Sequence, residues 1–426
     1  MAWSGRPKGI AAEFTKQNNE YDIGQFPCLR NISDMKKIAL AIENFSRFAG
    51  GAESYAVSLA CTLIDHSWEV HFFGQRWDGE PNNAIFHRIY IPKFLPRPLK
   101  LILFALKHRK EMKREQFDIV LGFGSTISMN VYQSHGGVHW LSTERMLYAC
   151  ESPLIRALKR LLTKLSLKHR ARHWIESAPF RQHPRPKIIA ISRMIRDDMA
   201  SYFHISKEEI EVVFNGVDLK RLNESHREKL QSPLRQRLNI TSGNVIFLFV
   251  SYNLKKKGIV PLVEAAALLK KSGEKNFSII VVGDRPYRSL LRRIDRLGIG
   301  QAIFFPGPVK NIDEYYANAD VFVLPTYYDA CSLVLLEAMA SGLPAITTEY
   351  NGAAGVIVNG ENGYIISHPP QPQELATKMA SLLSEENRRK MSLSASRSIK
   401  EYSIIKNHQH LLKIFDETIR RNRSLQ

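Results

Sequence analysis

The chain has 426 residues, of which 44% are hydrophobic and 24% are charged; this excludes a disordered or fibrous protein and fits a globular enzyme. Its 60 lysines and arginines outnumber 41 acidic residues, giving a formal charge of +19. Such an excess predicts an anionic partner, which could be nucleic acid, an acidic membrane surface or a phosphorylated substrate. The length predicts two domains.

The four cysteines, Cys28, Cys61, Cys150 and Cys331, are widely spaced and form no C-x-x-C pair. This spacing argues against a disulfide framework and a zinc site, and it favours a reducing compartment. The sequence shows no apolar run of the roughly 18–20 residues that span a bilayer, and no secretory signal at its N-terminus. We therefore predict a cytoplasmic protein.

Residues 1–34 are polar and lack the periodicity of a helix or a strand. We expect a poorly ordered extension there, or a start codon placed too early. The folded part is expected to begin near Met35.

From Met35 onward, apolar β-branched segments alternate with amphipathic segments. The predicted strands of the first half are residues 36–45, 68–74, 117–124 and 188–192; its helices are 50–66 and 192–203, and residues 211–218 close the set. The predicted strands of the second half are 244–251, 276–284, 302–307, 321–325 and 344–350; its helices are 261–273, 288–298 and one after residue 325.

Continuous apolar strands between helices are typical of parallel, doubly wound sheets. Two such sets occur, separated near residues 216–243. We therefore predict an α/β protein with two Rossmann-like domains, residues 35–218 and 219–400. Residues 385–426 are predicted to be helical, and the last part, 401–426, is expected to cross back to the first domain.

The segment YYDACSLVLLEAMASGLP places Asp329 and Glu337 eight positions apart around a predicted helix start. Ser332 is a suitable N-cap, so Leu333 and Val334 would present unpaired N–H groups to an anion such as a phosphate. Glu337 tilts back toward the helix start and would bind ribose hydroxyls, while Asp329 would meet hydroxyls beyond the diphosphate. On spacing alone, two solvated acids are favoured about two to one.

Three further strand ends of the second half could complete a nucleotide-diphosphate site, because ligands bind at the carboxyl ends of parallel strands. Lys256 and Lys257 follow the first strand, and Gly283 and Asp284 end the second. FFPGPV, which ends at Val309, offers backbone groups that could hold a nucleobase. Because these strand ends converge in one domain, we favour a nucleotide-diphosphate site over a set of solvated charges.

The segment D-A-C-S-L-V-L-L-E-A-M-A-S-G-L-P resembles the E-x7-E signature of glycosyltransferase family 4, retaining enzymes of the GT-B fold, in which two Rossmann-like domains face a cleft. K-K-G, G-D and F-x-G-x-V follow in the family's order, RFAGGAES resembles its glycine loop, and VVFNGVD its crossover segment. The resemblance covers roughly residues 36–415. FAGGAESYAVSLACTLIDHSWEVHFFGQRWDG and VYQSHGGVHWLSTERMLY are similar to the N-terminal domains of lipopolysaccharide core glucosyltransferases.

The resemblance implies that Glu337 binds the ribose and that Asp329 takes the first acid's place at the donor sugar. Lys256 and Lys257 would hold the diphosphate, matching an Arg-Lys pair common in the family. Asp329 is one methylene shorter than the usual Glu, and Lys256 stands where Arg is frequent. Both departures leave the identity of the donor sugar open.

The first half is implied to hold the acceptor. Gly50 and Gly51 would let the glycine loop approach the donor closely. His135 and His139, in SHGGVHW, could lie near the reaction centre, and we favour His139. Without the resemblance, such histidines are more often packing residues.

The resemblance implies a retaining transfer without a divalent metal. The N–H groups at the helix start and the two lysines would stabilise the leaving diphosphate. That phosphate is implied to accept the acceptor's proton, unlike hydrolases, which use two carboxylates. No D-x-D motif lies in a suitable loop, and Asp197 and Asp198, in a predicted helix, are expected to be solvated. The predicted catalytic residues are Asp329, His139 and Lys257.

Two basic segments, residues 154–172 and 97–114, carry leucines at helical spacing between lysines and arginines. Such a helix is typical of membrane-surface binding, although a domain helix with a solvated basic face is equally favoured for one segment. The charge of +19 and the lipid-linked acceptors of the family favour peripheral attachment to the inner face of the cytoplasmic membrane.

The predicted reaction moves a hexose, with UDP-glucose as the first choice of donor, to a lipid-linked or phosphorylated acceptor in lipopolysaccharide core or cell-envelope synthesis. UDP-N-acetylhexosamines, GDP-mannose and ADP-heptose stay open as donors. Alternatives are a sugar-nucleotide epimerase or phosphorylase of the same fold, although the cofactor-lysine motif of a phosphorylase is not seen. A basic nucleic-acid-binding protein is a third alternative, although no recognisable motif supports it and we expect no nucleic-acid partner.

Overall fold

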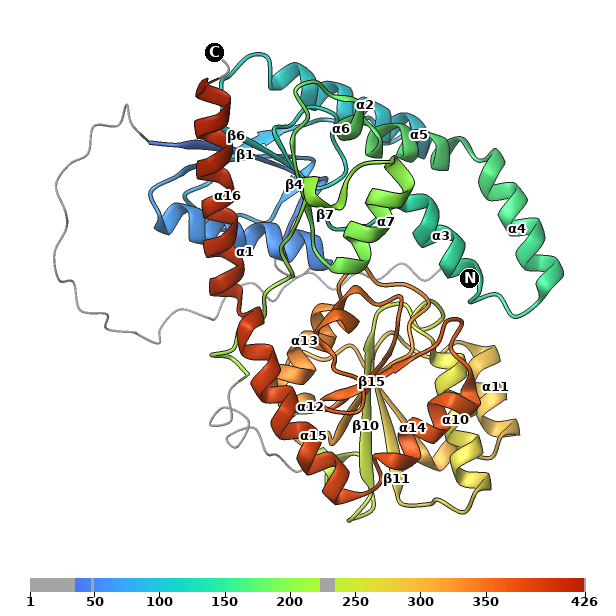
Figure 1. The fold of residues 1–426 in the computed structure, drawn as a ribbon. Coiled ribbons are helices and arrows are strands. Elements are labelled where there is room, and N and C mark those ends of the chain that lie inside the picture. Colours follow the sequence, from blue (N-terminus) through green and yellow to red (C-terminus); the bar gives the residue numbers. More distant parts are fainter. Residues whose placement is uncertain (1–34, 47–49, 223–233, 425–426) are drawn as a thin grey trace, which may run out of the picture. The chain divides into compact units, whose positions relative to one another are not determined.

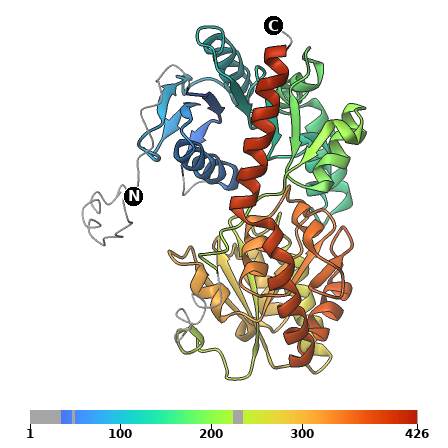
Figure 2. The same ribbon diagram turned by 60° about the vertical axis from the view of Figure 1, so that its left-hand side comes forward.

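A computed structural model describes residues 35–46, 50–222 and 234–424 of the chain (Figures 1 and 2). The predicted extension 1–34 lies outside these residues. A compact unit begins at Lys36, and two parallel sheets organise it.

The first sheet has seven strands in the described part of the chain, in the order β5-β3-β1-β6-β7-β8-β9, and all of its pairings are parallel. Its strands are β1 (Lys37–Ala41), β3 (Glu69–Gly74), β5 (Ile85–Arg88), β6 (Ile119–Gly122), β7 (Val131–Ser134), β8 (Lys187–Ala190) and β9 (Ile210–Val212). A separate parallel pair joins β2 (Asn44–Phe45) to β4 (Arg76–Trp77).

Helices cover both faces of this sheet because both faces are apolar. In β1, Ile38 and Leu40 point into one core, whereas Ala39 and Ala41 point into another, as alternate residues of a strand do. The elements of this half are α1 (Gly51–Asp65), α2 (Arg97–Glu111), α3 (His139–Leu147), α4 (Pro153–Leu165), α5 (Leu167–Glu176), α6 (Ala178–Arg181), α7 (Arg193–Phe203) and the 3-10 turn η2 (Lys207–Glu209).

The second sheet has six parallel strands among the described residues, in the order β12-β11-β10-β13-β14-β15. They are β10 (Val245–Ser251), β11 (Phe277–Gly283), β12 (Ile303–Gly307), β13 (Val321–Leu324), β14 (Ala345–Thr348) and β15 (Gly363–Ile366). β10, β11, β13 and β14 are buried along their whole length.

In Figure 1, α12, α13 and α15 lie on one side of the second sheet, and α10, α11 and α14 lie on the other. The helices of this half are α9 (Leu234–Arg237), α10 (Ile259–Lys271), α11 (Arg288–Arg296), α12 (Asp313–Asn318), α13 (Leu333–Ala340), α14 (Pro372–Ser381) and α15 (Glu385–Ser398). The 3-10 turns are η3 (Gly300–Ala302), η4 (Gly352–Val356) and η5 (Ile399–Tyr402).

The chain passes between the two sheets twice, and the two crossings run side by side. The Val217 N–H donates to the Tyr402 carbonyl and the Ile404 N–H donates to the Val217 carbonyl, each at 2.9 Å. A Cβ on Gly216 would lie 2.4 Å from the Cα of Ile404, so this close approach needs glycine. Beyond the crossing, α16 (Ile404–Ser424) buries Leu411, Ile414, Phe415 and Ile419 in the core of the first sheet.

The predicted fold class, two doubly wound parallel sheets, is confirmed. Two local predictions differ from the structure. The first predicted strand ends at Ala41 instead of continuing to residue 45, and the basic segment 154–172 is two helices that meet at Ser166. Ser166 has an extended backbone, with φ −71° and ψ 121°, and therefore ends one helix and begins the next.

Candidate active site

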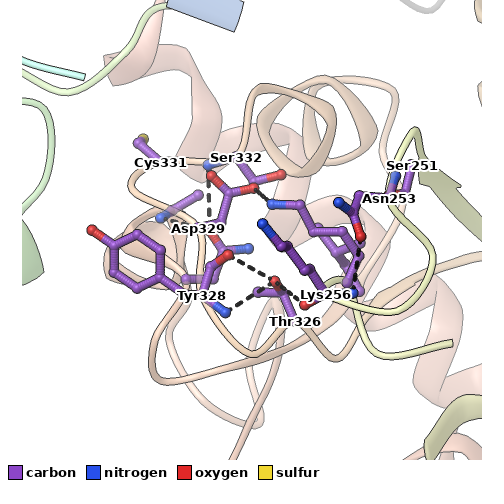
Figure 3. Close-up of polar contacts among 12 residues, drawn as sticks. Ser251, Asn253, Lys256, Thr326, Tyr328, Asp329, Cys331 and Ser332 are labelled. Atoms are coloured by element: carbon purple, nitrogen blue, oxygen red, sulfur yellow. Dashed lines mark hydrogen bonds and ion pairs between the residues drawn. The ribbon is translucent and has the colours of Figure 1, made fainter. Parts of the chain in front are cut away.

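The start of α13 is held by a network of buried polar groups in the loop after β13 (Figure 3). Asp329 donates its N–H to the Tyr350 carbonyl at 3.0 Å and accepts at its own carbonyl from the Gly352 N–H at 2.8 Å. Ser332, the N-cap, donates its N–H to the side chain of Asn351 at 3.3 Å. These bonds fix the loop, so the first N–H groups of α13, at Leu333 and Val334, emerge from a rigid base without intrahelical partners.

Asp329 and Lys257 form an ion pair at this helix start. The Nζ of Lys257 lies 2.5 Å from the Oδ2 of Asp329, and both side chains are about three-quarters covered, with 24% and 21% exposed. Gly258, with φ +84°, permits the approach, because a Cβ there would lie 1.9 Å from the Pro325 carbonyl oxygen. The structure therefore brings two of the predicted catalytic residues together.

Other predicted donor residues line neighbouring strand ends. The Lys256 side chain is exposed, while its carbonyl accepts from the Tyr327 N–H at 3.0 Å, which joins the two loops. Asp284, after Gly283, donates its N–H to the Ser251 carbonyl at 2.8 Å and thereby joins the ends of β10 and β11. Val309 lies half-buried in the loop after β12.

Glu337, one turn into α13, has both carboxylate oxygens engaged. Its Oε1 accepts from the Nη2 of Arg221 at 2.6 Å, and its Oε2 accepts from the hydroxyl of Tyr316 at 3.0 Å. Arg221 also lies 3.3 Å from Asp313. Burial opposes the charge of the guanidinium, but Glu337 and Asp313 outweigh it and raise the pKa of Arg221. Sequence analysis missed Arg221 and Tyr316.

A cavity of about 390 Å³ lies beside Glu337. It is lined by α1, by the first crossing segment, by α13 and by the start of α16: Ser54, Tyr55, Ser58, Cys61, Gly216, Val217, Asp218, Arg221, Leu333, Glu337 and Ile404. Gly51 begins α1, and a Cβ there would lie 3.4 Å from Leu333, so the starts of α1 and α13 are in contact range. Gly50 is the N-cap of α1.

Of the two candidate histidines, His135 lies in the loop between β7 and α3, and His139 is the first residue of α3. His139 donates its backbone N–H to the Glu176 carboxylate at 2.9 Å, and its Nε2 lies 2.7 Å from the Nδ1 of His169. Burial, aided by Arg172, lowers the pKa of His139 to about 3. Burial alone lowers the pKa of His135 to about 3. Both imidazoles are therefore neutral at pH 7, and His139 makes its side-chain contact with α5.

The expectation that Asp198 is solvated is wrong. Arg145 of α3 holds its carboxylate through two hydrogen bonds of 2.5 and 2.7 Å, and Asp198 is buried. The same guanidinium lies 3.9 Å above the ring of Tyr350 in the second half. Asp197, on the outer side, pairs with Arg196 and Lys207.

Within the described residues, one cluster has the composition of a metal site: His71, His87 and Glu115, whose candidate ligand atoms lie within 4.8 Å of one another. The Nδ1 of His71 and the Nε2 of His87 are 2.8 Å apart, and their rings are inclined by only 13°. This is the geometry of a hydrogen bond between two imidazoles. The ammonium of Lys37 lies 3.7 Å from Glu115 and already supplies a positive charge.

Two family models match the chain. The model "Glycosyltransferase Family 4" matches residues 49–221, and the model "Glycosyl transferases group 1" matches residues 231–418. The lipopolysaccharide glucosyltransferase WaaG of Escherichia coli K12 is 24% identical over 76% of this chain and 84% of its own. The N-acetyl-alpha-D-glucosaminyl L-malate synthase of Bacillus anthracis is 28% identical over 83% of this chain and 90% of its own.

Solved structures show the same fold. The crystal structure of WaaG covers 89% of this chain and 99% of its own with a TM-score of 0.73 and 20% identity. Anabaena HepE in complex with UDP and glucose covers 90% and 100%, with a TM-score of 0.64 and 18% identity. The predicted family is thus confirmed: this chain is a hexosyltransferase of the GT-B fold that belongs to glycosyltransferase family 4, with a group 1 glycosyltransferase module as its second half.

Proposed function

We propose that the protein is a retaining glycosyltransferase that moves glucose from UDP-glucose to a glycolipid or polysaccharide acceptor in lipopolysaccharide core or cell-envelope synthesis. The observation that carries the proposal is the arrangement around α13, where Lys257, Asp329 and Glu337 flank a helix start with free N–H groups. In a nucleotide sugar the diphosphate lies between the hexose and the ribose, just as the start of α13 lies between Asp329 and Glu337 in the chain.

Each part of the donor has a chemically suitable partner in this arrangement. The diphosphate would lie at the N–H groups of Leu333 and Val334, where the helix dipole is positive, and would attract Lys256 and Lys257. The ribose would bind Glu337 at the cavity, and the sugar would meet Asp329. Preorganised donors at the leaving group stabilise the charge that develops in the transition state, so the proposed reaction uses no metal.

Lys257 has a second role in this proposal. Its ammonium is paired with Asp329 at 2.5 Å, so it orients the acid that would contact the sugar and lies beside the departing diphosphate. The residues for the nucleobase are proposed to be Gly283, Asp284 and Val309 at the neighbouring strand ends.

The first half, residues 35–218, is proposed to bind the acceptor, and residues 219–400 the donor, with 401–426 returning to the first half. Gly50 and Gly51 would face the donor from α1. His139 stays our candidate near the acceptor, where a neutral imidazole could accept a hydrogen bond.

The identity of the donor rests on likeness. WaaG is named a glucosyltransferase, and HepE binds UDP and glucose. The malate synthase shows that relatives of similar identity use a different acceptor. The glycan acceptor is therefore proposed from the likeness to WaaG together with the exposed face of α4 in the first half.

Helix α4 supports attachment to an anionic membrane surface. Among its described residues none is buried, and Leu154, Leu158, Leu161 and Leu165 are 84%, 56%, 54% and 68% exposed. Arg160 pairs with Glu144, and Arg156 lies 4.6 Å above the Tyr148 ring, so part of the basic side packs on α3 while the leucine side stays uncovered. Amphipathic basic helices bind membrane interfaces in this way.

No helix among the described residues has both the length and the apolar composition that crossing a bilayer requires. We propose peripheral attachment at the inner face of the cytoplasmic membrane, through the leucines of α4.

The proposal is tested by nucleotide release from a panel of sugar nucleotides, with and without lipopolysaccharide-core acceptors. We expect acceptor-dependent release of UDP from UDP-glucose, with retained anomeric configuration and no loss in the presence of EDTA. Conversion of the sugar nucleotide without acceptor would favour an epimerase instead. Salt-dependent binding of oligonucleotides without sugar-nucleotide binding would overturn the proposal in favour of a nucleic-acid-binding protein.

A further inference from the structure

Arg221 connects the first crossing segment to the acid that is proposed to bind ribose. Its Nη2 lies 2.6 Å from Glu337, and its Nε lies 3.3 Å from Asp313. We propose that Arg221 is a positioning residue for the donor: it holds the Glu337 carboxylate in the orientation in which that carboxylate accepts the ribose hydroxyls. This inference rests on the proposed function, in which Glu337 is the ribose ligand.

The backbone at Arg221 is well anchored. The Oδ1 of Asp218 accepts from the N–H groups of Lys220 at 3.0 Å and Arg221 at 3.2 Å, which closes a turn. Leu222, the next residue, is buried. Just before the turn, Gly216 packs against Ile404 of the second crossing. The guanidinium therefore projects from a fixed support.

The hydrogen bonds at Glu337 leave room for a diol. A carboxylate offers about four lone-pair sites on its two oxygens. Arg221 occupies one on Oε1 and Tyr316 occupies one on Oε2, so one site on each oxygen is left. Two hydroxyls on adjacent ribose carbons match this pair of sites. Because one donor lies on each oxygen, rotation of the carboxylate about its last bond is restrained.

Charge gives a second reason for an arginine at this position. Asp313 and Glu337 would otherwise place two negative charges near the helix start that is proposed to bind a diphosphate, and like charges at short range repel. Arg221 neutralises part of this field, and it lines the same cavity as Glu337. A guanidinium is suited to bridging two carboxylates because its donors lie in one plane.

Arg221 acts through Glu337 in this account and does not touch the reacting atoms. Its removal should therefore affect nucleotide recognition more than the chemical step. In particular, removal of Arg221 should weaken the recognition of the ribose hydroxyls. A general loss of protein stability would not affect that recognition selectively.

The test compares binding of UDP and 2′-deoxy-UDP to the full-length protein by calorimetry. The wild-type protein should prefer UDP. In Arg221→Met, we expect the affinity for UDP to fall about tenfold, the size of one lost charged hydrogen bond, and the affinity for 2′-deoxy-UDP to fall less, because that ligand loses only the charge of Arg221 near the diphosphate. Glu337→Gln should lose the same preference, and the double variant should be no worse than Glu337→Gln alone. Arg221→Lys, which keeps the charge without the planar donors, should give an intermediate ratio.

Arg237→Met is the matched control, since Arg237 pairs with Glu314 at 3.0 Å in the same half and is 52% exposed. It should keep the wild-type ratio, and thermal unfolding should show that all variants are folded. If Glu337→Gln loses the preference but both Arg221 variants keep it, the inference is overturned while the ribose role of Glu337 stands. If the wild-type protein binds both nucleotides alike, or neither, the proposed donor site fails and the inference falls with it.

Discussion

The surroundings of α13 and the surface formed by α3, α4 and α5 carry charge in different ways. At α13, Asp329 is paired with Lys257, and Glu337 with Arg221, each at 2.5–2.6 Å. In the first half, the buried Glu176 accepts hydrogen bonds from the backbone N–H of His139, and α4 holds its leucines in the open.

This difference fits two kinds of recognition. Paired charges in fixed positions can distinguish the parts of one small ligand, because each hydrogen bond has a set direction. An exposed leucine face with basic residues binds a membrane surface. The strength of that binding depends on buried apolar area and on charge more than on the direction of single hydrogen bonds. Donor specificity should therefore be sensitive to single substitutions at α13, whereas acceptor-side binding should change by smaller steps.

The largest effect is expected from Glu337→Ala. The variant removes the proposed ribose ligand and leaves Arg221 and Tyr316 without their shared acceptor, so turnover should be abolished and nucleotide binding weakened. Acceptor-dependent nucleotide release and calorimetry with UDP would measure both. Turnover near the wild-type level would contradict the proposal that Glu337 binds the ribose while Asp329 binds the sugar.

Asp329→Ala should lower transfer by about a hundredfold, the loss of a transition-state contact of roughly 2–3 kcal/mol. Binding of free UDP should change by no more than about twofold, because UDP lacks the hexose that Asp329 is proposed to contact. Asp329→Asn is the matched control for shape, and it should also be impaired because it lacks the charge paired with Lys257. An equal loss of UDP affinity in Asp329→Ala and Glu337→Ala would contradict the division of labour.

Sequence patterns revealed the acids of α13 but not their partners. Asp329, Glu337 and Lys257 lie in short motifs next to predicted strand ends, and parallel sheets bring such ends together. Arg221 lies 116 residues from Glu337, and Tyr316 lies 21 residues away, and neither belongs to a periodic pattern. Contacts between side chains of separate segments depend on packing that the sequence does not display.

The same reasoning applies to the fold. Most central strands were predictable because they are continuous apolar runs that are buried on both faces. The edge strands β5 and β15 were missed: β5 has no buried residue, and β15 is buried only at its ends. Asp198 was misplaced because a carboxylate in a helix is usually solvated; it lies on the buried face of α7 with Ile195 and Met199, and its partner Arg145 comes from a separate helix.

Leu158→Asp tests the surface side of the comparison. The side chain is 56% exposed on the leucine face of α4, so a charge there should lower binding to anionic vesicles about tenfold, in line with a buried leucine's transfer energy of roughly 1.5–3 kcal/mol. Flotation with anionic and neutral vesicles would measure it. Leu393→Asp on α15, at a site that is 62% exposed, is the matched control and should bind as the wild type does. Equal flotation with both lipid types would remove the membrane proposal.

The smallest effect is expected from Glu176→Gln. The variant tests whether Glu176, in the first half, lacks a cationic partner of the kind that Asp329 and Glu337 have. Burial raises the pKa of Glu176 from 4.5 to about 7, because the charged form is disfavoured where water is excluded. Between these values the folded state binds more protons than the unfolded state, so this group makes the free energy of unfolding fall as the pH rises from about 5 to 7. Glu176→Gln keeps an oxygen that can accept from the His139 N–H but cannot ionise.

The variant should therefore remove a decrease of about 1–2 kcal/mol over this range, since one pKa unit corresponds to about 1.4 kcal/mol. Denaturant unfolding at several pH values would measure the slope. His139 acts with the opposite sign: its lowered pKa makes the unfolded state take up the proton first, so its contribution is lost as the pH falls below about 6.5. Because His139 is present in both proteins, the Glu176 effect should be read as the difference in slope between the wild type and Glu176→Gln from about pH 5 to 7. An unchanged slope there in Glu176→Gln would mean that Glu176 is ionised and paired, as the acids at α13 are.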